Sequence, residues 1–342
     1  MNTNFTHLNL HTEYSIVDGL IRIDKLVENM QTLNMPSIAV TDYKNLFAAI
    51  KFYRAAIASG IKPIIGAELQ VEGLAQNAAA SNVIFLCKDN LGYKNLTSII
   101  TKSYLDGQTT GVPIIQRSWL KNNNEGLIAL SCGLHGDVGH ALLYEHQSFL
   151  DETLLFWKQC FEDRFYLEIS RTGKDNEEEH IARAINLAHS ENLPIVATNA
   201  VRFLNEEDYE IHEAKVCIQE GRTLNDKRQV KNFSQKQYLR SSDEMCKLFE
   251  DIPEAIENSI EISKRCNVEF QFGKVALPAF PTPNKSSVEQ FLESQAHAGL
   301  ESRIQSGAVD DSLSKEKYLS PILCRINIPA VLIKIGFIFY LL

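Results

Sequence analysis

Several motifs that identify common enzyme classes are missing from this sequence of 342 residues. No G-x-G-x-x-G follows the first strand-like stretch and no P-loop occurs, which argues against a dinucleotide site and against a phosphate-binding loop of that type. The G-x-S-x-G motif of serine hydrolases is absent as well. None of the seven cysteines belongs to a C-x-x-C pair. We therefore expect neither a zinc ribbon nor a disulfide framework, and a reducing, cytoplasmic environment fits best.

Positive charge is scarce, because 34 Lys and Arg residues face 43 Asp and Glu residues and leave a net charge of −9. This balance argues against a protein that coats nucleic acid with its whole surface. No run of Lys or Arg interleaved with aromatic residues predicts a groove for a single strand. A local basic groove, or a subunit that leaves DNA contact to other domains, remains compatible with the composition.

Signals for membrane insertion or secretion are also lacking. The amino-terminal residues have neither the basic nor the apolar region of a secretory signal. The apolar run 326–342 is interrupted by Asn327, Pro329 and Lys334, and it is shorter than the ~20 residues that a membrane-spanning helix needs. We therefore expect no membrane partner and interpret this run as a truncated or out-of-frame end.

What the chain does contain is a regular alternation of short apolar strands and amphipathic helices over its first two hundred residues. The predicted strands lie at 6–11, 37–41, 62–71, 82–87, 126–131, 164–169 and 194–198. The predicted helices between them lie at 21–33, 45–60, 92–105, 137–162 and 176–191. Seven strands separated by helices predict an α/β fold with a largely parallel sheet, either open or closed into a barrel.

The pattern changes after about residue 206, where helices dominate. The stretch 276–287 contains three of the ten prolines and is interpreted as a connector between domains. We therefore divide the chain into a domain at 1–275, a Pro-rich connector at 276–287, and the truncated start of a second domain at 288–342. The last part has about 55 residues, which is fewer than a typical domain.

Candidate ligands follow the predicted strands, where parallel α/β folds bind their ligands. The first strand supplies Asn9 and His11, with Asp18 shortly after it, and the third supplies Glu68. His11, Asp18 and Glu68 together offer enough donors to hold one ion weakly. Phosphoester hydrolysis with two or three ions needs more ligands than these. No residue of the chain is therefore predicted to be catalytic.

The stretch 5–280 resembles the PHP (polymerase and histidinol phosphatase) domain that opens the α subunit of bacterial DNA polymerase III. The motifs that carry the likeness occur in the family's order: FTHLNLHTEYSIVDGL, IAVTDYKNLFAAIKFYRAAIASGIKPIIGAEL, NLGYKNLTSIITKSY, EGLIALSCGLHGDVG, FYLEISRTG, LPIVATNAVRF and MCKLFEDIPEAIENSIEISKRCNV. The resemblance implies a seven-stranded β/α barrel of the PHP type.

The resemblance also implies where metal ligands stand in the metal-binding members of the family. Three of these positions keep a ligand here, as His11, Asp18 and Glu68. Six positions have lost theirs and now read Asn9, Tyr43, Asn82, Gly133, Arg171-Thr172-Gly173 and Asn199-Ala200-x-Arg202. We therefore predict a vestigial site that has no resident cofactor, with residual Zn²⁺ or Mn²⁺ binding as the alternative left open.

For function, the resemblance implies a role in DNA replication. Full-length members of the family are DNA-directed DNA polymerases, nucleotidyltransferases that use Mg²⁺, and their catalytic aspartates lie in a palm domain beyond residue 342. This chain is accordingly expected to be inactive by itself and to serve as a scaffold that docks the proofreading exonuclease subunit beside other polymerase III subunits. DNA would be contacted only through other domains. The competing interpretation is a metal-dependent phosphoesterase or 3′–5′ exonuclease with a reduced site.

Overall fold

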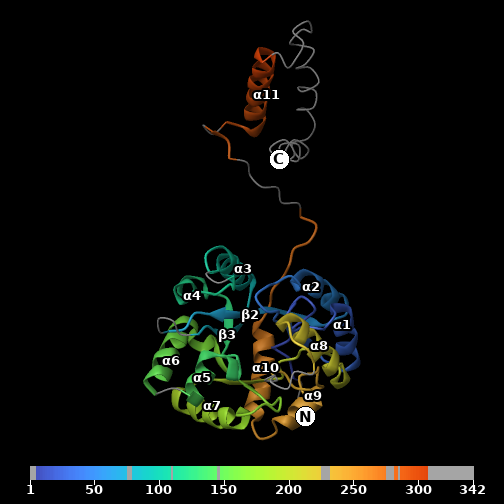
Figure 1. Ribbon diagram of the computed structural model, residues 1–342, viewed down its shortest axis with the longest axis vertical. Helices are drawn as coiled ribbons and strands as arrows, with labels where there is room; N and C mark the ends of the chain where they lie inside the picture. Colours follow the sequence, from blue (N-terminus) through green and yellow to red (C-terminus); the bar gives the residue numbers. More distant parts are fainter. Residues whose placement is uncertain are drawn as a thin grey trace. The chain divides into compact units, whose positions relative to one another are not determined.

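The computed structural model describes residues 5–74, 79–108, 111–144, 147–224, 232–274, 281–283 and 286–306. The chain divides into two compact units between Glu269 and Phe270 (Figure 1). In the second unit, helix α11 (Val288–Gln305) begins at a capping box in which the side chains of Ser287 and Gln290 bond each other's backbone N–H groups. Most of the predicted connector and the whole apolar run 326–342 lie outside the described residues.

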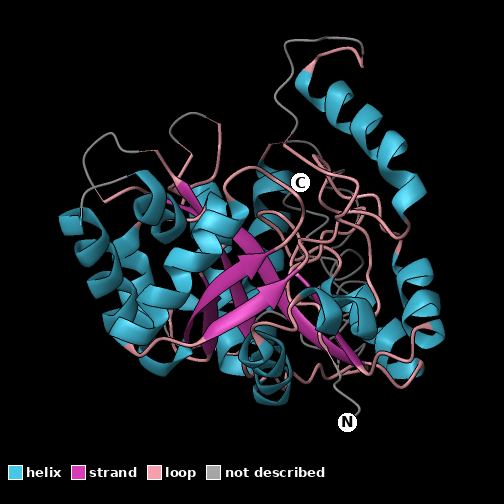
Figure 2. Cartoon of the chain, turned by 90° about the horizontal axis from the view of Figure 1, so that it is seen from below, coloured by secondary structure: helices cyan, strands magenta, loops and turns pink. Residues whose placement is uncertain are grey.

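A six-stranded sheet lies at the centre of the first unit, surrounded by helices (Figure 2). Its strands follow one another in chain order: β1 (Ser37–Val40), β2 (Lys62–Val71), β3 (Ser81–Cys87), β4 (Leu127–Leu130), β5 (Phe165–Ser170) and β6 (Ile195–Thr198). Each of them lies within one residue of a strand predicted from the sequence. The nearly continuous apolar runs are typical of strands that are covered on both faces.

The first predicted strand, 6–11, is not a regular strand, so the structure gives six strands where the sequence predicted seven. It is an extended segment with single bridges from His7 to Ile38 of β1 and from Leu10 to Val201 beyond β6. On one side, the His7 carbonyl accepts a hydrogen bond from Ala39 N at 2.8 Å. On the other side, His11 N donates to the carbonyl of Val201 at 3.0 Å. Because the segment divides its hydrogen bonds between both ends of the sheet, it forms no continuous ladder with either. The sheet is consequently curled.

The sheet is mixed, and the expectation of a largely parallel sheet is correct only in part. Strands β1 and β2, β4 and β5, and β5 and β6 pair in parallel, whereas β3 runs antiparallel to both β2 and β4. Only nine residues separate β2 from β3, which is fewer than a parallel crossover requires. Reversal of β3 brings its first residues, including Asn82, to the edge where the parallel strands end.

Helices pack around the sheet, as Figure 1 shows for the first unit. Six follow the predicted pattern: α1 (Ile23–Thr32), α2 (Ala49–Ala58), α3 (Asn90–Leu105), α5 (Asp137–Tyr144), α6 (Gln147–Phe161) and α7 (Glu177–Glu191). The short α4 (Arg117–Asn123) was not predicted. The helical region that follows consists of α8 (Tyr209–Glu220), α9 (Ser242–Leu248) and α10 (Pro253–Arg265), and three 3₁₀ turns complete the set: η1 (Gly133–His135), η2 (Glu162–Arg164) and η3 (Glu206–Asp208).

The interior of the curled sheet is an apolar core. Inward-facing side chains from every strand join Ile262 of α10 and the neighbouring Cys266 in one buried cluster, whose strand members include Ala39, Ile64, Ile84, Leu86, Ile128, Leu130, Tyr166 and Val196. Alternate residues along β3 and β4 contribute to it, as the period of a strand requires. Within the described ranges, no helix has the length and apolar content that crossing a bilayer demands.

Candidate functional site

The three predicted ligands converge at the mouth of the curled sheet. His11 lies on the extended segment 6–11, Asp18 on the loop that follows, and Glu68 within β2. All three line one cavity of about 220 Å³, together with Asn9 and Arg202. The sequence therefore selected side chains that do meet, although they are up to 57 positions apart in the chain.

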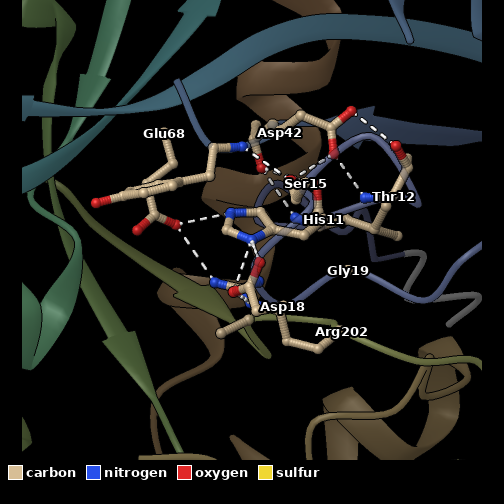
Figure 3. Close-up of polar contacts among 12 residues, drawn as sticks. His11, Thr12, Ser15, Asp18, Gly19, Asp42, Glu68 and Arg202 are labelled. Atoms are coloured by element: carbon tan, nitrogen blue, oxygen red, sulfur yellow. Dashed lines mark hydrogen bonds and ion pairs between the residues drawn. The ribbon is translucent and has the colours of Figure 1, made fainter. Parts of the chain in front are cut away.

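The loop that carries Asp18 is held by Asp42, which follows β1. The Asp42 carboxylate accepts from Thr12 N, Thr12 Oγ1 and Ser15 Oγ, each at 2.7 Å (Figure 3). The loop then closes so tightly that a Cβ on Gly19 would lie 1.8 Å from Thr12 O. Only glycine fits there. Burial raises the pKa of Asp42, and the hydrogen bonds from Ser15 and Thr12 oppose that shift.

His11 bonds a carboxylate through each ring nitrogen. Nδ1 lies 2.8 Å from Asp18 Oδ1, and Nε2 lies 3.0 Å from Glu68 Oε2. A carboxylate only accepts, so both nitrogens donate and the ring is an imidazolium. Burial and the nearby Arg202 lower the pKa of His11, but Asp18 and Glu68 outweigh them and raise it to about 9.

Arg202 adds a second cation to the same two carboxylates (Figure 3). Its Nε donates to Asp18 Oδ2 at 2.9 Å and its Nη2 to Glu68 Oε2 at 3.3 Å. Nη1 donates to Asn9 Oδ1 at 3.0 Å, and the residue is 5% exposed. The sequence had marked Arg202 only as a lost ligand. The resemblance implies a histidine at this position, so the permanent cation of an arginine there was the signal that the sequence offered.

The backbone around Arg202 fixes where its side chain enters the site. Ala200 lies in the left-handed region with φ of 46°, and its carbonyl accepts from Gln237 Nε2 at 3.0 Å. Arg202 N in turn donates to Gln237 O at 2.9 Å. The left-handed conformation costs a residue other than glycine about 1–2 kcal/mol. The surrounding contacts therefore have to hold this turn in place.

Both carboxylates that meet the two cations are ionised. Burial alone would raise the pKa of Glu68, but His11 and Arg202 lower it to about 2. The same two cations hold the pKa of Asp18 well below its usual range, against the effect of burial. Asn82 Nδ2 donates to the other oxygen of Glu68 at 2.7 Å. The site is therefore a closed network of two cations and two anions.

Tyr43 and Glu168, two further residues from the strand ends, lie around this network. Tyr43 places its ring 6.2 Å from the His11 ring, centroid to centroid. Glu168 Oε1 accepts from Asn9 Nδ2 at 3.0 Å and from Thr198 Oγ1 at 2.5 Å. Burial raises the pKa of Glu168, and these two hydrogen bonds oppose the shift. Asn9 thus bridges Glu168 and Arg202, because its amide nitrogen donates to Glu168 and its amide oxygen accepts from Arg202.

These residues do not fit a catalytic metal ion. A metal ligand must offer a lone pair, and both His11 nitrogens already donate to carboxylates. Arg202 bonds Asp18 Oδ2 and shares Glu68 Oε2 with His11. The other Glu68 oxygen accepts from Asn82 Nδ2. Within the described parts of the chain, no group of three or more His, Cys, Asp or Glu side chains is arranged to hold an ion. A guanidinium and an imidazolium supply the positive charge instead.

The chain matches a known domain family over residues 7–172, and that family is the PHP domain. These residues form a PHP domain. The match confirms the resemblance on which the ligand positions were assigned, and it covers His11, Asp18 and Glu68 but ends before Arg202. The PHP fold is α/β, and here its sheet has six curled strands.

Curated relatives extend the likeness over the rest of the chain. DNA polymerase III subunit alpha of Pseudomonas aeruginosa is 43% identical over the whole of this chain, which covers 29% of that protein. The protein of the same name from Escherichia coli K12 is 45% identical over 88% of this chain, which covers 26% of it. The chain therefore resembles the polymerase III α subunit and spans less than a third of these relatives.

Solved structures show weaker likenesses. A metal-dependent phosphoesterase from Bifidobacterium adolescentis aligns with a TM-score of 0.41 at 10% identity, over 58% of this chain and 87% of that one. An amidohydrolase from Chromobacterium violaceum, solved with bound sulfate and no metal, aligns with a TM-score of 0.39 at 13% identity, over 61% and 96%.

Proposed function

We propose that this chain is a PHP domain without hydrolytic activity, which serves as a structural module of a replicative polymerase of the polymerase III α type. One observation carries the proposal: the Arg202 guanidinium bonds both acidic side chains that a catalytic ion would use, Asp18 and Glu68. His11, Asp18 and Glu68 are on this view a vestigial metal set, now joined by internal cations. We infer that segment 6–11 is the remnant of the seventh strand of a PHP barrel.

The partner that this role requires is a second protein of the same cytoplasmic replication complex. We propose the proofreading exonuclease subunit, which would supply the hydrolytic activity that this domain lacks on our proposal. Polymerisation with Mg²⁺ would belong to the full-length protein, with residues 276–287 as a connector and 288–342 leading toward its palm. The support for this assembly is the identity of 43% and 45% to two α subunits.

The proposal is tested by measuring hydrolysis and binding on the same preparation. Labelled single-stranded DNA with Mn²⁺ or Zn²⁺ should release no nucleotides, and mass spectrometry of unchelated protein should find no stoichiometric metal. Calorimetry with the purified exonuclease subunit should show a complex. Nucleotide release that disappears in Glu68→Ala would show instead that the site is a reduced phosphoesterase. An inert chain that also fails to bind the exonuclease would remove the docking role.

Restoring the metal ligands should succeed only when Arg202 is also replaced. The substitutions Asn9→His, Tyr43→His and Ala200→Asp add three ligands, but Arg202 still bonds Asp18 and Glu68. We expect no rise in melting temperature with Zn²⁺ for this triple variant. Addition of Arg202→His should produce a rise, because metal that binds only the folded state stabilises it by linkage. An equal rise in both variants would show that Arg202 does not exclude the ion.

A further inference from the structure

An apolar stripe lies on the outer face of α2 and on the turn that leads into this helix. Ile50 and Ile57 are seven residues apart, so they lie two turns apart on one face. They are 42% and 54% exposed, and Phe47, three residues before Ile50, is 70% exposed. The helix also contains two basic residues, Lys51 and Arg54, and no acidic one. Because both basic residues are exposed, the outer face of α2 is apolar and basic.

A second apolar stripe with the same spacing lies on α8. Ile211 and Ile218 are also seven residues apart on one helical face, and they are 63% and 80% exposed. Acidic residues gather at the amino-terminal end of this helix and in the 3₁₀ turn η3 directly before it. Those exposed to solvent are Glu206, Glu207 and Glu210. The outer face of α8 is therefore apolar and acidic.

The loop after the first extended segment connects the two stripes. On one side of it, Asn45 Nδ2, in the turn before α2, donates to the carbonyl of Tyr14 at 3.0 Å. On the other side, Lys215 Nζ of α8 donates to the carbonyl of Ser15 at 3.4 Å. Ile16 follows these two loop residues and is 71% exposed. Large apolar side chains gathered in this way on a protein surface mark an interaction site.

The outer faces of α2 and α8 complement each other, but they do not meet within one copy, since both are exposed to solvent. Each presents two isoleucines separated by about 10.5 Å, the rise of seven residues of helix. Their charges are opposite. A surface whose two halves are complementary suits a two-fold dimer, because each half then packs against the other half of the second copy.

We propose that this surface binds a second copy of the chain in a two-fold dimer, with α2 of each copy packed against α8 of the other. The isoleucine pairs of the two helices form the apolar contact, and Arg54 lies beside Glu210 of the second copy. Ile16 lies nearest the two-fold axis, because its loop separates the two helices. The inference goes beyond the proposed docking role and does not depend on it, since the dimer needs no other protein.

The test measures the molar mass of the 342-residue chain by sedimentation equilibrium. The wild-type chain should form dimers at micromolar concentration, and added salt should weaken them, because opposite charges face each other. Ile218→Asp puts a carboxylate into the apolar contact twice per dimer and should weaken association about a hundredfold or more. Leu155→Asp is the matched control on α6, where Leu155 is 57% exposed, and it should leave association unchanged. Circular dichroism verifies that both variants are folded.

Charge reversal on each face tests which helices meet. Arg54→Glu and Glu210→Lys should each weaken self-association about tenfold or more, because each variant's dimer contains two contacts between like charges. A mixture of the two variants should associate more tightly than either variant by itself, since both contacts of the mixed dimer join opposite charges. This recovery is specific to a two-fold contact between α2 and α8.

Several results would overturn the proposal. A wild-type chain that stays monomeric throughout the concentration series has no such dimer. Association that is unchanged in Ile218→Asp belongs to another surface, and a mixture of the charge-reversed variants without recovery shows that α2 and α8 do not meet. A monomeric chain in which Ile218→Asp instead weakens the complex with the exonuclease subunit would assign this surface to that partner rather than to a second copy.

Discussion

Replacement of Arg202 by methionine should lower the free energy of unfolding by about 3–5 kcal/mol, because it leaves buried carboxylates without one of their two cations. Asp18 and Glu68 both lie within 3.3 Å of the guanidinium. His11 alone cannot neutralise two anions. Denaturant unfolding of the wild-type and variant chains measures the loss.

Two further variants test whether the loss comes from the uncompensated charges. Arg22→Met removes an exposed arginine whose carboxylate partner, Glu13, is 3.8 Å away, so it should change stability by less than about 1 kcal/mol. Addition of Asp18→Asn to Arg202→Met should recover part of the lost stability, because it removes one of the uncompensated charges. If Arg202→Met costs no more than the Arg22 control, the guanidinium is not what balances the site.

Stability should also fall on the alkaline side, through His11. Its pKa is about 9 in the folded chain, above the unfolded value of about 6.5. The folded state therefore holds the proton more tightly between these values, and its advantage is complete below pH 6.5 and lost as the pH rises through 9. The loss amounts to roughly 3 kcal/mol. Unfolding free energies measured from pH 6 to 10 should show this decline.

At acidic pH the free energy of unfolding depends on other groups, and these provide a control for the titration of His11. Burial lowers the pKa of His7 to about 4, so its contribution is lost as the pH falls from 6.5 toward 4. The contribution of Glu68, whose pKa is about 2, is lost at still lower pH. His11→Gln should abolish the alkaline decline, whereas His7→Gln should leave it and reduce the acidic one. An unchanged alkaline decline in His11→Gln would assign the titration to another group.

Much of the fold follows from local sequence pattern. The apolar runs that became β3 and β6, and the helical periodicity of α1 and α7, are properties of neighbouring residues, so they can be recognised without knowledge of the tertiary structure. The direction of β3 and the state of segment 6–11 depended on pairing between distant strands. His7 bonds β1, whereas Leu10 faces Val201, 191 positions away. No local pattern contains that choice.

At the site, the sequence by itself determined which residues meet. The family motifs mark His11, Asp18 and Glu68 as survivors and Arg202 as a departure. What these residues now do was decided by tertiary structure. Asp18 and Arg202 are 184 positions apart, yet the fold brings Oδ2 and Nε to 2.9 Å. At that distance in a buried site the guanidinium balances the charge of the carboxylate, and the strength of this interaction depends on separation in space and on burial, neither of which the order of residues records.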